Sequence, residues 1–261
     1  MSRPHRTRKV KLDYVITIPT YQRVNTFYKK TYSRIIKPYR LENKVLLLIQ
    51  TDNDAKQYKE RMPELKQLRT PKGLLETVNY VASTFPKQKP IVMMHDDVTR
   101  LLYVKPPCVK RLTVKNADVL FRRVFRLMKQ NKCHLGGLYP TNNPLSMVPQ
   151  PAVTTNLRFI HDPVTFMYNQ NILLHKEHAC KMDFERTILY YQQDHKILRM
   201  NHYGFATAYN PKTAEGGFGY RDASKEKKES AKFVNTYGKY INRVIVHKDG
   251  TTSFALKPTP P

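Results

Sequence analysis

The chain lacks any apolar run long enough to cross a membrane. Its longest purely aliphatic run covers residues 45–49, and no apolar segment follows the charged residues 1–9 as it would in a signal peptide. The only cysteines, Cys108, Cys133 and Cys180, are odd in number and show no C-x-x-C spacing, which argues against a disulfide framework or a zinc ribbon. We therefore expect a soluble protein with reduced thiols that stays in the cytoplasm.

Two common nucleotide-binding loops are also absent. The sequence contains neither G-x-G-x-x-G nor a Walker A lysine loop, which argues against a dinucleotide dehydrogenase or a P-loop ATPase. Acidic residues are scarce, because 20 Asp and Glu stand against 46 Lys and Arg and leave a formal net charge of +26. Such an excess attracts polyanions and favours nucleic acid through counterion release, without specifying a base sequence. DNA or RNA is therefore the expected class of partner.

The apolar pattern predicts an α/β fold. A chain of 261 residues with 40% hydrophobic residues can bury a sizeable core as one large or two small domains. Strand-like apolar runs alternate with helical patterns, which is typical of α/β proteins. The expected strands cover residues 14–18, 44–50, 91–94 and 164–168, with a helix over 74–85. We expect a mostly parallel sheet flanked by helices.

Two adjacent aspartates, Asp96 and Asp97, follow the buried strand predicted at residues 91–94, directly after His95. Carboxylates held together repel each other unless positive charge lies between them. The pair therefore suggests Mg²⁺ or Mn²⁺ with oxygen ligands, and this cation would hold the phosphates of a nucleotide. An acidic turn that caps a helix would show the same pair.

The first two predicted strands end in polar clusters as well. In an open parallel sheet the carboxyl ends of the strands line the ligand crevice. Side chains from three strand ends are therefore expected to converge there: Thr20, Arg23, Asp52, Asp54 and Asp97. Each cluster alone could equally be an ordinary loop.

A further carboxylate, Asp194, lies in the segment 191–201, which is expected to form a short helix with Asp194 near its start. A carboxylate in the first turn is stabilised by the helix dipole. Asp194 could act as a base that takes a proton from an acceptor hydroxyl, and a simple capping role is the alternative.

The basic residues are clustered. Residues 105–132 carry nine positive charges against Asp118 alone. Within this block a helical pattern gives a core side formed by Ala117, Leu120, Phe121, Val124 and Met128. The opposite side carries Arg122, Arg126 and Lys129, which we interpret as a phosphate-contacting surface, although a merely solvated face would look the same.

The order of these motifs resembles the glycosyltransferase A fold. In that fold a first strand ends in a proline-polar loop, a D-x-D motif binds metal and the nucleotide-sugar diphosphate, and a later E-D pair lies beside the acceptor. The matching segments are Ile18-Pro19-Thr20-Tyr21-Gln22-Arg23, Thr51-Asp52-Asn53-Asp54, His95-Asp96-Asp97-Val98 and Gln193-Asp194-x-x-x-Leu198. Within the fold, residues 12–222 look most like the TET-associated glycosyltransferases of phages, which are related to the kinetoplastid base J glucosyltransferase.

This resemblance implies an enzyme that uses Mn²⁺ or Mg²⁺ and transfers a sugar from a nucleotide-sugar donor to a hydroxymethylated pyrimidine in DNA, in the cytoplasm of an infected bacterial host. It implies Asp97 as metal ligand, Asp194 as catalytic base, and a donor site formed by Pro19, Thr20, Arg23, Asp52, Asp54 and Asp96. The chain departs from the family pattern at two places. His95 stands at the first D of D-x-D, and Gln193 stands at the E of E-D.

Two other functions remain open at this point. A nucleotidyltransferase or polymerase palm also uses paired aspartates, and Asp52 or Asp54 would then have to supply a further metal-binding carboxylate. A noncatalytic basic DNA-binding module would leave the polar strand ends without a use.

The chain is expected to divide into a basic arm (1–11), a catalytic domain (12–222) and a basic C-terminal extension (223–261) with a disordered end. The glycine-rich segment 213–221 suits a loop that closes over a donor. Tyr21, Phe218 and Tyr220 are candidates for stacking on an extruded base.

Overall fold

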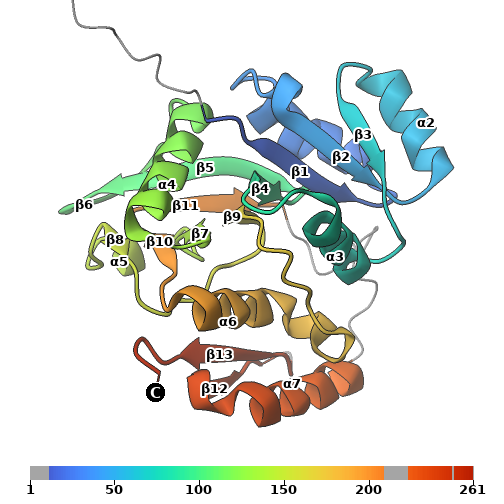
Figure 1. The fold of residues 1–261 in the computed structure, drawn as a ribbon. Helices are drawn as coiled ribbons and strands as arrows, with labels where there is room; N and C mark the ends of the chain where they lie inside the picture. Colours follow the sequence, from blue (N-terminus) through green and yellow to red (C-terminus); the bar gives the residue numbers. More distant parts are fainter. Residues whose placement is uncertain (1–11, 209–222, 249, 261) are drawn as a thin grey trace, which may run out of the picture.

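A computed structural model describes residues 12–208, 223–248 and 250–260, and it shows a mixed α/β fold (Figure 1). The main sheet has eight strands in the order β3-β2-β1-β4-β9-β7-β10-β8. Most neighbours are parallel, while β9 runs against β4 and β7, and β8 runs against β10. The strands are β1 (Val15–Thr20), β2 (Val45–Ile49), β3 (Lys66–Arg69), β4 (Pro90–Met94), β7 (Leu135–Leu138), β8 (Val153–Thr154), β9 (Val164–Tyr168) and β10 (Leu198–Met200).

Two smaller sheets complete the β structure. The first contains β11 (Tyr203–Thr207), β5 (Val98–Lys105) and β6 (Cys108–Thr113), and the second is the hairpin β12 (Ile241–Val246) and β13 (Thr252–Leu256). The α-helices are α1 (Val24–Phe27), α2 (Asp52–Arg61), α3 (Leu74–Thr84), α4 (Ala117–Asn131), α5 (Pro144–Met147), α6 (Met182–Asp194) and α7 (Ala223–Tyr237). Shorter or wider helical turns cover Tyr28–Ile36, Glu42–Lys44, Lys176–Lys181 and Gly238–Tyr240. None of the described helices combines the length and apolar character that crossing a bilayer requires.

The strand β4 is buried on both faces, as expected for the interior of a mostly parallel sheet. Val92 and Met94 belong to one hydrophobic core, and Ile91 and Met93 belong to the core on the other face. The predicted strand is therefore confirmed. The residues that follow Met94 therefore lie at the carboxyl edge of the sheet.

Helix α4 packs its apolar side on the sheet as predicted. All five expected core residues are buried, and the Asn116 side chain caps the helix by accepting a hydrogen bond from Val119 N at 3.0 Å. Close packing on β7 requires glycine beneath the helix, because a Cβ atom at Gly136 would lie only 2.9 Å from the sulfur of Met128.

The predicted helix around Asp194 is wrong. Asp194 is the last residue of α6, and His195 ends that helix in the left-handed conformation with φ of 54°. The following residues form β10, which pairs in parallel with β7 through Leu198 opposite Gly136. Helical periodicity over residues 191–201 was misleading, because the apolar residues after Ile197 face the core from a strand.

The C-terminal residues are packed against α6. Figure 1 shows α7 and the hairpin β12–β13 beneath this helix. Phe233 of α7 is completely buried and stacks on Phe254 of β13, with ring centroids 5.0 Å apart. Leu157 N donates a hydrogen bond to Pro258 O at 3.1 Å, so residues 257–260 are not the disordered end that the sequence predicted. The expected basic arm and the glycine-rich segment, including Phe218 and Tyr220, lie outside the described residues.

Candidate active site

The end of β1 is joined to the end of β4 through side-chain hydrogen bonds. Thr20 Oγ1 donates to Asp96 Oδ2 at 2.9 Å. The same hydroxyl shares a hydrogen bond of 2.6 Å with the phenol of Tyr58 from α2. The two strands are adjacent and parallel, with Val15 opposite Ile91, so residues 76 positions apart meet at one edge. The ends of these two strands therefore meet at the carboxyl edge, as expected for a parallel pair, and Thr20 and Asp96, both predicted for the donor site, are in contact.

Arg23 lies against both aspartates. Its NH1 donates to Asp96 Oδ1 at 2.8 Å, and its NH2 is 3.8 Å from Asp97 Oδ2. Burial raises the pKa of Asp96 to about 6, while the charge of Arg23 opposes this shift and the charge of Asp97 adds to it. One guanidinium therefore neutralises only part of the negative charge of the pair.

Asp97 has the geometry of an incomplete ligand. The residue is 5% exposed, and its Oδ1 is enclosed without a hydrogen-bond partner among the described residues. A buried carboxylate oxygen without a partner is costly, so this atom fits a cation. No three His, Cys, Asp or Glu side chains of the described residues gather closely enough to hold a metal by themselves. Phosphate oxygens would have to supply the other ligands, as is usual for Mg²⁺.

The two aspartates after β2 behave differently. Asp54 is buried and its Oδ2 accepts a hydrogen bond from Gln22 N at 3.2 Å, so it holds the loop that follows β1. The Asp52 side chain is 98% exposed and lies 3.3 Å from Arg69. Among the described contacts, Asp54 binds the backbone of Gln22 and Asp52 binds Arg69, and neither carboxylate contacts Asp97 as a palm domain would require. Pro19 is buried within β1 opposite Leu48 and serves the edge only through the backbone.

A second group at this edge was missed by sequence analysis. The residues before β9 run beside β4, because His95 N donates to Pro163 O at 3.1 Å. This brings Asp162 close, and its Oδ1 accepts a hydrogen bond from NH1 of Arg186 at 2.8 Å, with both side chains buried. Burial lowers the pKa of His95, with the charges of Asp162 and Asp97 opposing the shift. His95, at the first D of the motif, is therefore a neutral side chain among carboxylates.

Asp183 lies in the first turn of α6, beside the same group. Burial raises the pKa of this carboxyl to about 6, and the charge of Asp162 adds to the shift. Its Oδ1 accepts a hydrogen bond from Phe184 N at 2.9 Å, and no described side chain pairs with it. Two acidic residues, Asp183 and Glu185, at the start of an apolar helical pattern indicate the beginning of α6. The sequence analysis did not identify Asp183, because it predicted the helix too far along the chain.

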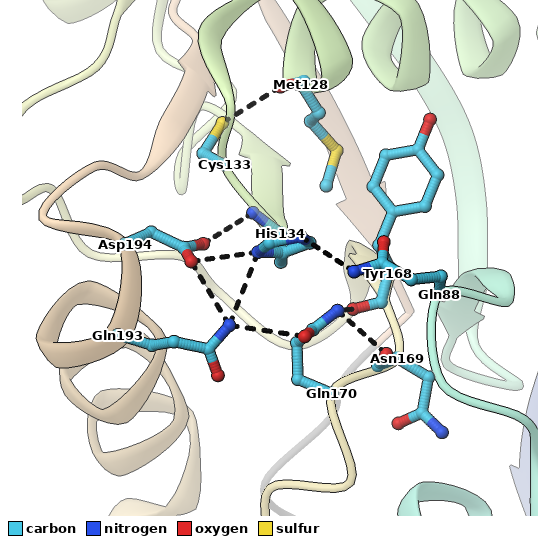
Figure 2. A network of polar contacts seen from close by, with 9 residues as sticks. All are labelled: Gln88, Met128, Cys133, His134, Tyr168, Asn169, Gln170, Gln193 and Asp194. Atoms are coloured by element: carbon cyan, nitrogen blue, oxygen red, sulfur yellow. Dashed lines mark hydrogen bonds and ion pairs between the residues drawn. The ribbon is translucent and has the colours of Figure 1, made fainter.

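Asp194 lies at the opposite edge of the sheet. It accepts hydrogen bonds from His134 N at 2.7 Å and from the His134 ring at 2.8 Å, and Gln193 and Gln170 continue this network (Figure 2). His134 precedes Leu135, which aligns through β9 with Ile91 at the start of β4. From that level β4 continues for three more residues to Met94, or about 10 Å, and Asp97 lies beyond this end in a turn. Among the described residues Asp194 is therefore paired with His134 and shows no contact with the aspartate pair, although the sequence predicted it as the base.

The predicted basic surface is reduced to two residues. Arg122 Nε donates to Asp118 Oδ2 at 2.8 Å, and its guanidinium lies 5.5 Å from the centre of the Tyr14 ring. This arginine therefore stabilises the contact between α4 and the start of β1. Arg126 and Lys129 are exposed on the same helix.

No protein-family model matches the chain, and no curated protein matches it in sequence. The structure is similar to glucosyl-3-phosphoglycerate synthase from Mycobacterium tuberculosis in complex with Mn²⁺, UDP and glucosyl-3-phosphoglycerate, with a TM-score of 0.52, 9% identity, and coverage of 99% of this chain and 94% of that chain. The complex of that enzyme with Mn²⁺, UDP-glucose and phosphoglyceric acid gives a TM-score of 0.52, 11% identity, and coverage of 100% and 95%.

The mannosyltransferase PcManGT from Pyrobaculum calidifontis, in complex with GDP-Man and Mn²⁺, gives a TM-score of 0.49 and 12% identity, over 87% of this chain and 65% of that chain. The chain thus spans just under two thirds of that mannosyltransferase. The similarity to the synthase confirms the predicted glycosyltransferase A fold.

Proposed function

We propose that the protein is a metal-dependent glycosyltransferase that moves a sugar from a nucleotide-sugar donor to the hydroxyl of a hydroxymethylated pyrimidine in DNA. The observation that carries this proposal is the buried pair Asp96 and Asp97 beside Arg23, with Asp97 Oδ1 left without a partner. The pair ends a central strand of a fold shared with an enzyme crystallised with Mn²⁺ and UDP-glucose.

The donor half of the site would be formed by the loop after β1 and the end of β4. Asp97 would hold Mn²⁺ or Mg²⁺, which supplies positive charge to the leaving nucleoside diphosphate. Arg23 is held in place by Asp96 and adds a second positive charge near the diphosphate. Asp54 fixes the backbone at Gln22 and so orients this loop.

The base on the acceptor side would be Asp183 in place of Asp194. A general base needs an accessible carboxylate close to the reacting hydroxyl, with a pKa not far below the working pH. Asp183 is half-buried, lies beside Asp162 at the carboxyl edge, and has a pKa raised to about 6 by burial. Asp194 is less available to a substrate hydroxyl, because both of its oxygens bind His134.

DNA is proposed as the acceptor because of charge. The net charge of +26 attracts polyanions, and Arg126 and Lys129 provide exposed cations on α4. The resemblance of the motif order to the TET-associated enzymes supports the same choice. A hydroxymethyl group inside a duplex must be extruded before it can reach a sugar donor. Tyr21, half-buried in the loop after β1, is available to stack on such a base.

The test is incubation of the protein with Mn²⁺, a panel of nucleotide sugars, and DNA with or without hydroxymethylated pyrimidines. Released nucleoside diphosphate and the masses of digested nucleosides are then measured. We expect diphosphate release with one donor and a hexose mass on the hydroxymethylated nucleoside alone. Lack of release with every donor would contradict the transferase, and transfer only to protein hydroxyls would contradict the DNA acceptor.

A further inference from the structure

Arg199 of β10 is a buried cation that pairs with no carboxylate in the part of the chain that the structure describes. Its side chain lies in the interior, with the residue only 7% exposed. The other buried cations of the described residues are neutralised, since Arg186 pairs with Asp162 and Lys181 pairs with Glu226. No described carboxylate lies within ion-pair distance of Arg199, although taking a charge out of water without a counter-charge is costly.

The guanidinium of Arg199 is nevertheless held in one orientation. Its Nε donates to Asn201 Oδ1 at 2.7 Å, and its planar group lies 4.9 Å from the centre of the Tyr139 ring. Asn201 is itself fixed, because it is fully buried and its Nδ2 donates to Pro151 O at 2.8 Å. The two terminal nitrogens of Arg199 donate no hydrogen bond within the described residues, and neither is sealed from solvent. The guanidinium of Arg199 is thus held in one orientation, and within the described residues its two terminal nitrogens remain available to a ligand.

A second arginine strengthens the local positive field. Burial lowers the pKa of Arg199 to about 10, Tyr139 opposes this shift, and the charge of Arg158 adds to it. Arg158 donates through Nε to the amide of Asn156 at 3.3 Å and has no carboxylate partner among the described residues either. Two neighbouring cations without an acid are stabilised when an anion enters between them.

Arg199 faces the same side of the sheet as Asp183. Its neighbours Leu198 and Met200 point into the core beneath α4, so Arg199 points to the other face. On that face a Cβ atom at Gly137, which pairs with Arg199, would touch Ile160. Ile160 N in turn donates a hydrogen bond of 3.2 Å to the Thr187 hydroxyl of α6. The face is therefore the one on which α6 packs.

The strand register places Arg199 close to the reacting end. Arg199 pairs with Gly137, Gly137 pairs with Thr165, and Thr165 pairs with Met93 of β4. Three strand spacings separate Arg199 from β4, or about 14 Å across the sheet. An acceptor that reaches the end of β4 can thus extend over Arg199.

We propose that Arg199, assisted by Arg158, binds a phosphate group of the acceptor. The identification of this ligand as the acceptor rests on the proposed function, whereas the anion site itself does not. A guanidinium whose two terminal nitrogens bind no described residue matches two phosphate oxygens, which is the geometry arginine provides and lysine does not. The phosphate belongs either to a nucleic-acid backbone or to a small phosphorylated acceptor, and both present the same chemistry to the fork.

The experiment measures binding to the full chain without metal or sugar donor. Four proteins are compared: the wild type, Arg199→Met, Arg199→Lys, and the control Arg34→Met, which removes an exposed arginine elsewhere. Inorganic phosphate is the first probe, read by the melting temperature and by calorimetry. Phosphoglyceric acid and a single-stranded oligonucleotide containing hydroxymethylcytosine follow, and the corresponding free nucleoside serves as the probe without phosphate.

We expect phosphate to raise the melting temperature of the wild type and of Arg34→Met, and to leave that of Arg199→Met unchanged. Affinity for one phosphorylated probe should fall at least about tenfold in Arg199→Met and less in Arg199→Lys, which keeps the charge without the fork. Loss confined to the oligonucleotide assigns the phosphate to a nucleic acid, and loss confined to phosphoglyceric acid assigns it to a small acceptor. Equal nucleoside binding in all four proteins shows that the loss concerns the phosphate.

The proposal is overturned if the wild type binds none of the phosphorylated probes, or if Arg199→Met binds them as the wild type does. Should Arg199→Met fail to fold, Arg199→Lys and Arg158→Met decide the matter by the same comparison. Since no donor is present, a failure of sugar transfer leaves these results intact. Conversely, transfer to DNA by a protein whose phosphate binding ignores Arg199 would refute the anion site and leave the enzyme activity standing.

Discussion

The guanidinium of Arg23 donates a hydrogen bond of 2.8 Å to the carboxylate of Asp96, across 73 positions of sequence. This contact joins the loop after β1 to the end of β4 and partly neutralises a buried acidic pair. It leaves Asp97 Oδ1 without a partner, so the site is arranged to receive further positive charge. A cation that arrives with a nucleotide diphosphate would supply that charge.

The first prediction separates the two candidate bases. Asp183→Asn should reduce turnover by about a hundredfold or more with donor binding retained, because the proton acceptor is lost. The matched change Asp194→Asn should leave turnover of the folded protein near that of the wild type. It should lower the free energy of unfolding by about 1–3 kcal/mol, since the hydrogen bonds to His134 are weakened. Turnover is measured by diphosphate release and stability by urea unfolding, and a reversed pattern would restore Asp194 as the base.

The second prediction concerns pH. Because burial raises the pKa of Asp183 to about 6, this carboxylate is protonated below that pH and ionised above it. A base must be ionised, so kcat/KM should rise about tenfold per pH unit below pH 6 and level off above it. Asp96 has a pKa raised to about 6 as well, but a bound cation would lower it. The rise should therefore persist in saturating Mn²⁺ and disappear in Asp183→Asn; a flat wild-type profile from pH 5 to 7 would contradict the assignment.

A third prediction tests the DNA surface. Replacing Arg126 and Lys129 by Glu should weaken duplex binding and lower the slope of log K against log salt by about one unit for each phosphate contact that is lost. The change Arg122→Gln should instead mainly destabilise the fold, since this side chain binds Asp118 and the backbone of Leu12. Fluorescence anisotropy of a labelled duplex at several salt concentrations measures the binding, and urea unfolding measures the stability. An unchanged slope in the double variant would exclude α4 from the DNA interface.

The fourth prediction concerns the C-terminal residues. Phe233→Ala should lower the free energy of unfolding by about 3–5 kcal/mol, because a completely buried ring that stacks on Phe254 leaves a cavity. The exposed Lys232→Ala in the same helix serves as control and should change stability by less than about 0.5 kcal/mol. Equal stability of the two variants would show that α7 is an appendage of the domain and not part of its core.

Local patterns predicted the elements that position the donor half of the site. The runs before Thr20 and Asp96 are mainly apolar, with Thr17 as the one polar residue of Val15–Pro19, and each forms a central strand whose carboxyl end reaches the same edge. Parallel pairing then brings these residues together without further information. The amphipathic pattern of α4 also predicted its helix correctly, because one face is apolar over about four turns.

The acceptor half was not predictable in this way. Leu198 and Met200 alternate with a buried arginine in a short strand, and this pattern also fits a helix. The helix predicted over residues 191–201 included Asp194 and left out Asp183. In the structure α6 covers Met182–Asp194, and Asp194 pairs with His134 at the far edge of the sheet. Arg199 could not be recognised from the sequence either, because only the folded structure shows that no described carboxylate lies beside it.

The most direct test of the account is calorimetric binding of a nucleoside diphosphate, with and without Mn²⁺, to the wild type and to Asp97→Asn. The account predicts that Mn²⁺ tightens binding to the wild type by at least about tenfold, since the cation bridges Asp97 and the diphosphate. Asp97→Asn should lose this dependence while its melting temperature stays close to that of the wild type. Diphosphate binding that is equally strong in both proteins and indifferent to Mn²⁺ would contradict the metal and donor site at the end of β4.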